Sequence, residues 1–127
     1  MGSGADRPEG EELLLEREGD LTVVRLRVPK LYVGGAAERV GKALLESARR
    51  GAFRKLLIDF TQVEGISSAL LGTLAVLYRV LQKQGGVMRI FGLGEGLERV
   101  FEIARLRDLF GIDPDEETAR SEVERHP

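Results

Sequence analysis

Two neighbouring serines, Ser67 and Ser68, stand where a short apolar segment gives way to a longer helical pattern. The segment from Lys55 to Phe60 is typical of a buried strand, and the apolar spacing after Ser68 predicts a helix. The first turn of a helix has unpaired N–H groups and a partial positive charge, so a serine there can cap the helix or carry a phosphate. A phosphate would add about −1.5 to −2 charges. The serine pair therefore has two chemical interpretations, a helix cap and a modification site.

The sequence offers few other groups for catalysis or metal binding. It has no cysteine, which excludes disulfides, thiolate catalysis and cysteine-bound metals. Its single histidine, His126, cannot form a triad or a histidine-based metal site. The carboxylates of Asp59, Glu64 and Asp108 are scattered along the chain with no visible base, nucleophile or metal partner, which favours strand-end or surface roles. We expect no enzyme activity and no cofactor.

A glycine-rich segment, Gly92-Leu93-Gly94-Glu95-Gly96, lies between a predicted strand and a predicted helix. Phosphate-binding loops occupy that position in nucleotide-binding folds. Here Leu97 stands where the dinucleotide fingerprint has its third glycine, and Glu95 would repel a phosphate. We therefore favour a flexible strand-to-helix turn, with nucleotide binding as the minor alternative.

Length and charge restrict the function further. The 127 residues, 43% of them hydrophobic and 31% charged, suit one globular domain. A formal net charge of −2 lacks the one-sided positive field of a dedicated nucleic-acid-binding protein. No segment reaches the roughly 18 consecutive apolar residues of a membrane helix, and the first residues do not form a signal peptide pattern. We expect a cytoplasmic protein that neither binds nucleic acid nor inserts into a membrane.

The remaining pattern predicts the elements that position the serine pair. In chain order these are a hairpin of strands 13–18 and 21–28, a helix at 36–50, a strand at 55–60, a helix at 68–84, a strand at 87–91, a helix at 95–104 and a last helix at about 114–125. This order indicates an α/β fold, with a mixed β-sheet of four to five strands and a parallel centre, packed by three to four helices. Residues 1–12 are assigned to a flexible N-terminal tail and 13–127 to a single domain.

Four segments along this order resemble the STAS domain of anti-sigma factor antagonists. Members of that family have an apolar strand ending in Asp, a short loop, the motif Ile-Asp-Ser-Ser-Gly-Leu or Ile-Ser-Ser-Ala-Gly-Leu, a helix, a glycine pair and another strand. The matching segments here are Leu56-Leu57-Ile58-Asp59-Phe60, Ile66-Ser67-Ser68-Ala69, Leu77-Tyr78-Arg79 and Gly85-Gly86-Val87-Met88-Arg89-Ile90. The resemblance runs from Lys55 to about Phe110 and implies a STAS-like fold.

The resemblance also implies a non-enzymatic regulator that works by partner switching. In the family, an anti-sigma factor that is also a serine kinase binds the unmodified domain and releases its sigma factor. Phosphorylation of a serine breaks that complex, and a serine phosphatase resets it. The matching phosphoacceptor here is Ser68, with Ser67 as the second choice. The kinase would bind ATP, and this chain would be a monomer or a weak homodimer.

The expected contact surface surrounds the serine pair and consists of Gln62, Val63, Ile66, Ser67, Ser68, Leu70 and Leu71. Leu70 stands where both family motifs have glycine. An outward Leu70 would be a hydrophobic anchor for a partner, whereas an inward Leu70 would pack under the first helix. Both placements stay open at this point. Leu70 also favours an alternative function, in which a STAS-like scaffold or accessory subunit of a signalling assembly or lipid-transport complex uses this surface without phosphorylation.

Overall fold

Five strands form the main sheet of the computed structural model, which describes residues 12–126. In spatial order they are β1 (Leu13–Glu18), β2 (Leu21–Leu26), β4 (Lys55–Asp59), β6 (Val87–Phe91) and β7 (Ile112–Asp113). β1 and β2 are antiparallel, and each of the other neighbouring pairs is parallel. The mixed sheet with a parallel centre is confirmed. The tail predicted for residues 1–12 lies outside the described residues except for Glu12.

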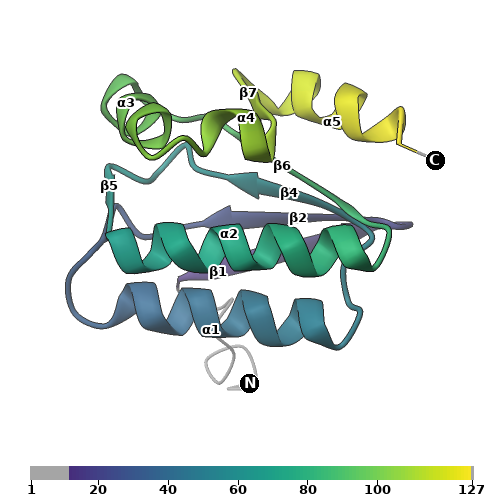
Figure 1. Ribbon diagram of the computed structural model, residues 1–127, viewed down its shortest axis with the longest axis horizontal. Helices are drawn as coiled ribbons and strands as arrows, with labels where there is room; N and C mark the ends of the chain where they lie inside the picture. The colour runs from purple at the N-terminus through teal and green to yellow at the C-terminus, as the bar shows by residue number, and fades with distance from the viewer. Residues whose placement is uncertain (1–11, 127) are drawn as a thin grey trace.

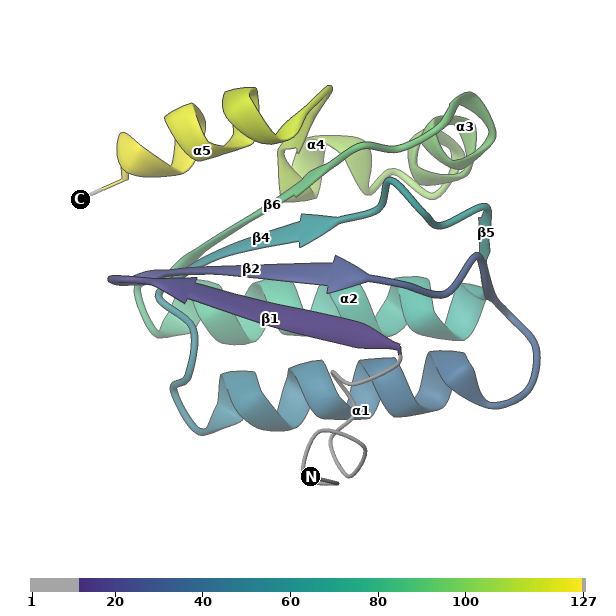
Figure 2. The same ribbon diagram turned by 180° about the vertical axis from the view of Figure 1, so that it is seen from behind.

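Helices cover both faces of this sheet. Within residues 12–126 they are α1 (Ala36–Arg49), α2 (Ser68–Lys83), α3 (Glu95–Ile103), α4 (Arg107–Phe110) and α5 (Glu116–Glu124). α1 and α2 run side by side along one face and begin at the same end of the molecule, while α5 lies over the opposite face (Figures 1 and 2). The start of α2, with the serine pair, is therefore next to the start of α1.

Alternation along the strands divides the apolar side chains between two cores. The larger core includes Ile58 of β4 and Leu74 of α2, both almost fully buried, and extends under α1. The smaller core lies on the other face and consists of Val23, Leu57, Phe91, Ala119 and Val123. The last helix has few apolar residues, but two of them are buried on the sheet. Its short apolar stripe is therefore sufficient to cover this face.

The sequence pattern does not predict four short elements. Two of them, β3 (Lys30–Leu31) and β5 (Gly65–Ile66), pair in parallel as a separate two-stranded sheet. The other two are α4 and β7. Each has two to four residues, which is too short for a hydrophobic period to be recognised. The second strand of the hairpin ends at Leu26 and not at Val28, because the following backbone turns toward β5.

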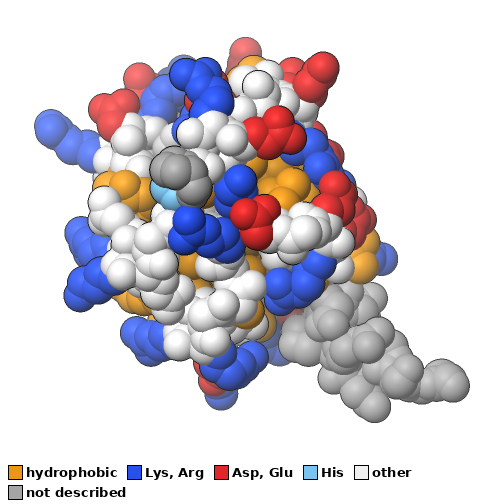
Figure 3. Space-filling model, turned by 90° about the vertical axis from the view of Figure 1, so that its right-hand side faces the viewer, with side chains coloured by type: hydrophobic (Ala, Val, Ile, Leu, Met, Phe, Trp, Pro, Cys, Tyr) orange, Lys and Arg blue, Asp and Glu red, His pale blue; other side chains and the backbone are white. Residues whose placement is uncertain are grey.

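The ends of α1 and α2 carry exposed basic side chains (Figure 3). Arg49 and Arg50 lie at the end of α1, and Lys83 lies in the last turn of α2. Positive charges at this position offset the negative end of the helix dipole. Acidic side chains are interspersed with the basic ones on the same face (Figure 3). This end of the molecule is therefore of mixed charge, without a continuous basic patch.

Candidate functional site

Ser67 caps α2. Its backbone is extended, with φ −77° and ψ 154°, and its Oγ accepts a hydrogen bond from the N–H of Leu70 at 3.1 Å. Its carbonyl oxygen accepts the N–H of Leu71 at 3.1 Å. Both acceptors satisfy donors that a helix start leaves unpaired. Of the two serines, Ser67 is therefore the structural residue.

Ser68 is the first residue inside α2, and its side chain is exposed. Among residues 12–126 its hydroxyl has no hydrogen-bond partner. The first turn of α2 contains no acidic residue, so the partial positive charge of the helix start is not offset there. The position is thus sterically open and electrostatically suited to an anionic group.

The two-stranded sheet of β3 and β5 fixes the approach to the serine pair. The N–H of Ser67 donates to the carbonyl oxygen of Leu31 at 2.9 Å. The N–H groups of Glu64 and Gly65 both donate to the carbonyl of Pro29, at 2.7 and 3.1 Å. These bonds lock the backbone before α2 to the segment after β2. Two of the elements that the sequence pattern missed, β3 and β5, therefore position the site.

Tyr32 extends this site beyond the predicted residues. Its ring lies over Gly65, where a Cβ atom would be only 2.6 Å from Tyr32 Cε2, so a side chain at position 65 would displace the ring. Tyr32 and Val33 are 52% and 53% exposed, so two neighbouring apolar side chains are accessible here. The sequence signal was the apolar pair Tyr32-Val33 directly before Gly34-Gly35.

The expected surface contact through Val63, Leu70 and Leu71 is corrected, because the structure buries all three side chains. Their exposed fractions are 5%, 2% and 8%, and all three belong to the larger core. Leu70 and Leu71 are buried because this side of α2 faces α1 and the sheet. Of the other predicted contact residues, Gln62 and Ser68 are exposed, while Ile66 and Ser67 are half-buried. The accessible part of the site is smaller and more polar than expected.

A groove between α1 and α2 begins beside Ser68. It is lined by Ala37, Glu38, Gly41, Lys42, Leu45, Ala69, Leu70 and Thr73. The helices approach closely at Gly41, where a Cβ atom would lie 3.2 Å from both Leu70 Cδ1 and Thr73 Cγ2. Leu70 thus packs against a backbone position without a side chain, and its bulk forms part of the groove floor.

The glycine-rich segment after β6 has a packing role at its first residue. Gly92 has a φ of +81°, and a Cβ atom there would collide with Thr61. Thr61 in turn donates its N–H and its hydroxyl to Asp59 Oδ1 at 2.8 and 2.7 Å. The backbone at Gly92 therefore packs closely on Thr61. The N–H of Phe60 donates to the carbonyl of Phe91 at 3.0 Å and joins the ends of β4 and β6, and α3 begins at Glu95. The segment forms a strand-to-helix turn, as favoured from the sequence.

Two arginines and four carboxylates on the α5 side form an ion-pair network. Arg25 contacts three carboxylates and Arg120 two, all at 2.9 to 3.0 Å, and the carboxylates belong to Glu16, Glu18, Asp59 and Glu116. Hydrogen bonding to Glu116 and Glu16 raises the pKa of Arg25, and the bond to Arg25 lowers the pKa of Glu116. The network joins β1, β2, β4 and α5, and every carboxylate in it is paired.

Among the described residues, no group of three or more His, Asp or Glu side chains is arranged to hold a metal ion. Across residues 12–126, the helices are too short or too polar to cross a bilayer.

Comparison with known proteins places these features in a family. A family model described as the STAS domain matches residues 13–119. No match was found among curated proteins. A solved putative anti-sigma factor antagonist from Thermotoga maritima is 23% identical, with a TM-score of 0.76, and the alignment covers 89% of this chain and 95% of that one.

Two further similar structures are of the anti-sigma factor antagonist SpoIIAA. The unphosphorylated form is 18% identical, with a TM-score of 0.67, over 89% of this chain and 98% of that chain. The phosphorylated form, from Bacillus, is 20% identical, with a TM-score of 0.67, over 87% and 98%. At these identities the solved structures show a shared fold.

Proposed function

Because the chain belongs to the STAS domain family, we propose that it is a regulatory binding module controlled by reversible phosphorylation of Ser68. The observation that carries this proposal is the division of roles between the two serines. Ser67 Oγ is engaged as the helix cap, whereas the Ser68 hydroxyl is exposed and unbonded within the described residues. A kinase can therefore modify Ser68 without removing the cap.

Phosphorylation at this position would leave the fold intact. The phosphate would be attached to the first helical residue, where the uncompensated positive end of α2 favours a dianion. Its formation transfers a phosphoryl group from the kinase's ATP to Ser68 Oγ, which loses its proton. The modification therefore changes the surface of the module without destabilising the fold.

A phosphate on Ser68 would weaken the binding of a partner. The exposed or half-buried residues of this region are Tyr32, Val33, Gln62, Ile66, Ser68 and Ala69, which we call the Ser68 surface. Gln62, Ile66 and Ala69 lie within six residues of Ser68 in the chain, and Tyr32, which precedes Val33, has its ring over Gly65. Val33 and Ile66 are apolar, and Tyr32 has an apolar ring with a polar hydroxyl. A partner seated on them would bury a phosphate without a matching cation, which costs desolvation energy and breaks the complex.

The partner in this proposal is an anti-sigma factor that is also a serine kinase, with a serine phosphatase as the enzyme that resets the switch. The support is the likeness to SpoIIAA, an anti-sigma factor antagonist whose structure is solved in both unphosphorylated and phosphorylated forms. The partner's own site binds ATP, and this chain contributes the acceptor hydroxyl and the docking surface.

Mass spectrometry of the protein from its own host tests the switch. Trypsin cleaves after Lys55 and Arg79, so both serines lie in the single peptide 56–79. Fragment ions should place a phosphate on Ser68 that changes with growth conditions, and Ser68→Ala should abolish it while Ser67→Ala should not. A peptide that stays unmodified under all conditions would refute the switch and favour the scaffold or accessory role.

A further inference from the structure

The outer edge of β1 is an open strand edge. In the sheet order β1 is terminal, and within residues 12–126 no strand lies beyond it. The N–H of Arg27 donates to the carbonyl of Glu12 at 2.8 Å, which fixes the register of the antiparallel pair. Since bonded pairs alternate along such a ladder, the backbone groups of Leu13, Leu15 and Arg17 point away from β2. Within residues 12–126 they present a row of unpaired donors and acceptors.

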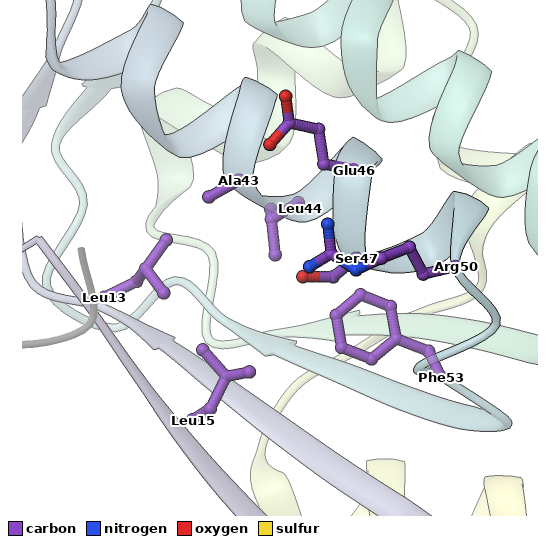
Figure 4. A pocket seen from close by; sticks show the side chains of 8 residues that line it. All are labelled: Leu13, Leu15, Ala43, Leu44, Glu46, Ser47, Arg50 and Phe53. Carbon is purple, nitrogen blue, oxygen red and sulfur yellow. The ribbon is translucent and has the colours of Figure 1, made fainter. Parts of the chain in front are cut away.

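An apolar pocket of about 220 Å³ lies directly beside this edge, between β1 and the second half of α1 (Figure 4). Leu13 and Leu15 form its β1 side and face Leu44 and Phe53 (Figure 4). Ala43, Glu46, Ser47 and Arg50 complete the lining. A strand added to β1 would have every second side chain directed toward this pocket, because side chains alternate between the faces of a sheet.

The opposite face of the same edge is acidic. Glu16 and Glu18 point to the α5 side, and their side chains are 39% and 56% exposed. Both belong to the network of two arginines and four carboxylates, whose formal charge is therefore −2. The other side chains of an added strand would lie next to this excess negative charge, which favours lysine or arginine there.

The same charges disfavour a second copy of the chain. When β1 pairs antiparallel with β1 of a second copy, even-numbered residues lie opposite even-numbered residues and odd-numbered opposite odd-numbered ones, with their side chains on the same face of the sheet. Centring the pair on Glu16 places Glu16 opposite its own copy, and centring it on Leu14 or Leu15 places Glu12 opposite Glu16 or Glu18. Like charges directly opposite each other destabilise a sheet. Pairing of β1 with β1 of a second copy is therefore disfavoured.

From these observations we infer that the β1 edge binds an extended segment of a partner protein that alternates apolar and basic residues. The segment adds a sixth strand to the main sheet, with its apolar side chains over the pocket and its basic side chains beside Glu16 and Glu18. Backbone hydrogen bonds to Leu13, Leu15 and Arg17 supply the binding, and the two faces supply the selectivity. This site is separate from the Ser68 surface and does not depend on the proposed switch.

The test uses the full chain and a synthetic eight-residue peptide of alternating valine and lysine. We expect saturable binding by NMR titration, with slowed hydrogen exchange at the amides of Leu13, Leu15 and Arg17. A matched valine and glutamate peptide should bind about 2- to 30-fold more weakly. Absence of saturable binding, or equal binding of the two peptides, would overturn the inference.

Backbone methylation of the peptide provides the sharper control. One version carries N-methyl groups on its valines and the other on its lysines. In a strand, successive N–H groups point to opposite edges, so only one version can still hydrogen-bond to β1. Loss of binding by one version supports strand addition, and retention by both contradicts it. Amides at Leu13, Leu15 and Arg17 that are already protected in the free chain would also contradict it, because the edge would then be occupied by a second copy or by the chain itself.

A protein variant tests the charge selectivity without touching the pocket. Glu16→Gln combined with Glu18→Gln should reduce the preference for the lysine peptide over the glutamate peptide by at least about twofold. Glu64→Gln, which removes an exposed carboxylate near the serine pair, is the matched control and should leave the preference unchanged. An unchanged preference in the double variant would refute the role of the two carboxylates and with it the inference.

Discussion

Leu70 Cδ1 lies over Gly41, so close that a Cβ atom at position 41 would be 3.2 Å from it. The side chain on α2 therefore fills the space that a side chain on α1 would otherwise occupy. This pairing explains how the helix start accommodates leucine where the family motifs have glycine. The bulk is directed inward, between the two helices, and leaves the Ser68 hydroxyl accessible.

We predict that Leu70 and Gly41 are energetically coupled. Leu70→Ala should cost about 2–5 kcal/mol, because it leaves a cavity between α1 and α2. Gly41→Leu should cost about 1–3 kcal/mol by overpacking. Since the added side chain fills the cavity, the double variant should be at least about 0.5 kcal/mol more stable than the sum of the single costs implies. Urea unfolding of the four proteins measures this coupling, and strict additivity would contradict it.

The two serines should differ in their contribution to stability. Ser67→Ala removes the hydroxyl that accepts the Leu70 N–H and should lower the free energy of unfolding by about 1 kcal/mol. Ser68→Ala removes an exposed, unbonded hydroxyl and should change it by less than about 0.5 kcal/mol. Urea unfolding of both variants checks the assignment. Equal losses would mean that the capping role is shared.

A charge at Ser68 should weaken partner binding without unfolding the module. Ser68→Asp should bind the proposed partner, an anti-sigma factor kinase, at least about tenfold more weakly than Ser68→Ala, because the complex would bury an unpaired carboxylate. Calorimetric titration measures the affinities, and the melting temperatures of both variants serve as the control for folding. Equal affinities would exclude a charge switch at this residue.

Tyr32 should be an anchor of the same contact. It is 52% exposed and its ring lies over Gly65 beside the serine pair. Tyr32→Ala should weaken partner binding about 5- to 30-fold, in the range of buried aromatic anchors. Val76→Ala is the matched control, because Val76 is also exposed but lies on α2 about two turns beyond Ser68. Similar losses in both variants would argue against a localised contact.

Acidification should loosen α5 before the rest of the fold. Bonds to Arg25 hold the pKa of Glu116 below its usual value, and the N–H of Thr118 does the same for Asp115 at the start of α5. Their contribution to stability is present above the unfolded carboxyl pKa of about 4 and is lost as pH falls through the lower folded values. Glu116→Gln should therefore show a smaller stability loss between pH 7 and pH 3 in urea unfolding, and an identical loss would contradict the role of Glu116.

The sequence pattern predicted the long elements because each buries a periodic stripe. α1 and β4 are examples, since their apolar residues recur at helical spacing or as a continuous run. β3 and β5 escaped prediction because two residues have no period, and their pairing depends on backbone bonds between segments far apart in the chain. The serine pair was found by residue type, whereas Tyr32 joined the site only through this unpredicted sheet.

The direction of Leu70 could not be predicted for a related reason. A leucine in the first turn of a helix can point to the surface or to the core. Here Leu70 points inward because Gly41 of α1, 29 positions earlier in the chain, leaves room for its side chain. The sequence also does not show which residue caps α2, because both candidates, Ser67 and Ser68, are serine. The extended backbone of Ser67 and the hydrogen bond from the Leu70 N–H to its Oγ distinguish it from the helical Ser68.

The smaller core has a consequence for how the chain folds during synthesis. Val23 lies on β2, but its cover includes Val123 of α5, which the ribosome adds 100 residues later. At about 5–20 residues per second, that interval is roughly 5–20 s. During it the growing chain can complete its hairpin while one apolar sheet face stays open to solvent. A nascent chain halted before α5 should therefore be a preferred client of ribosome-associated chaperones.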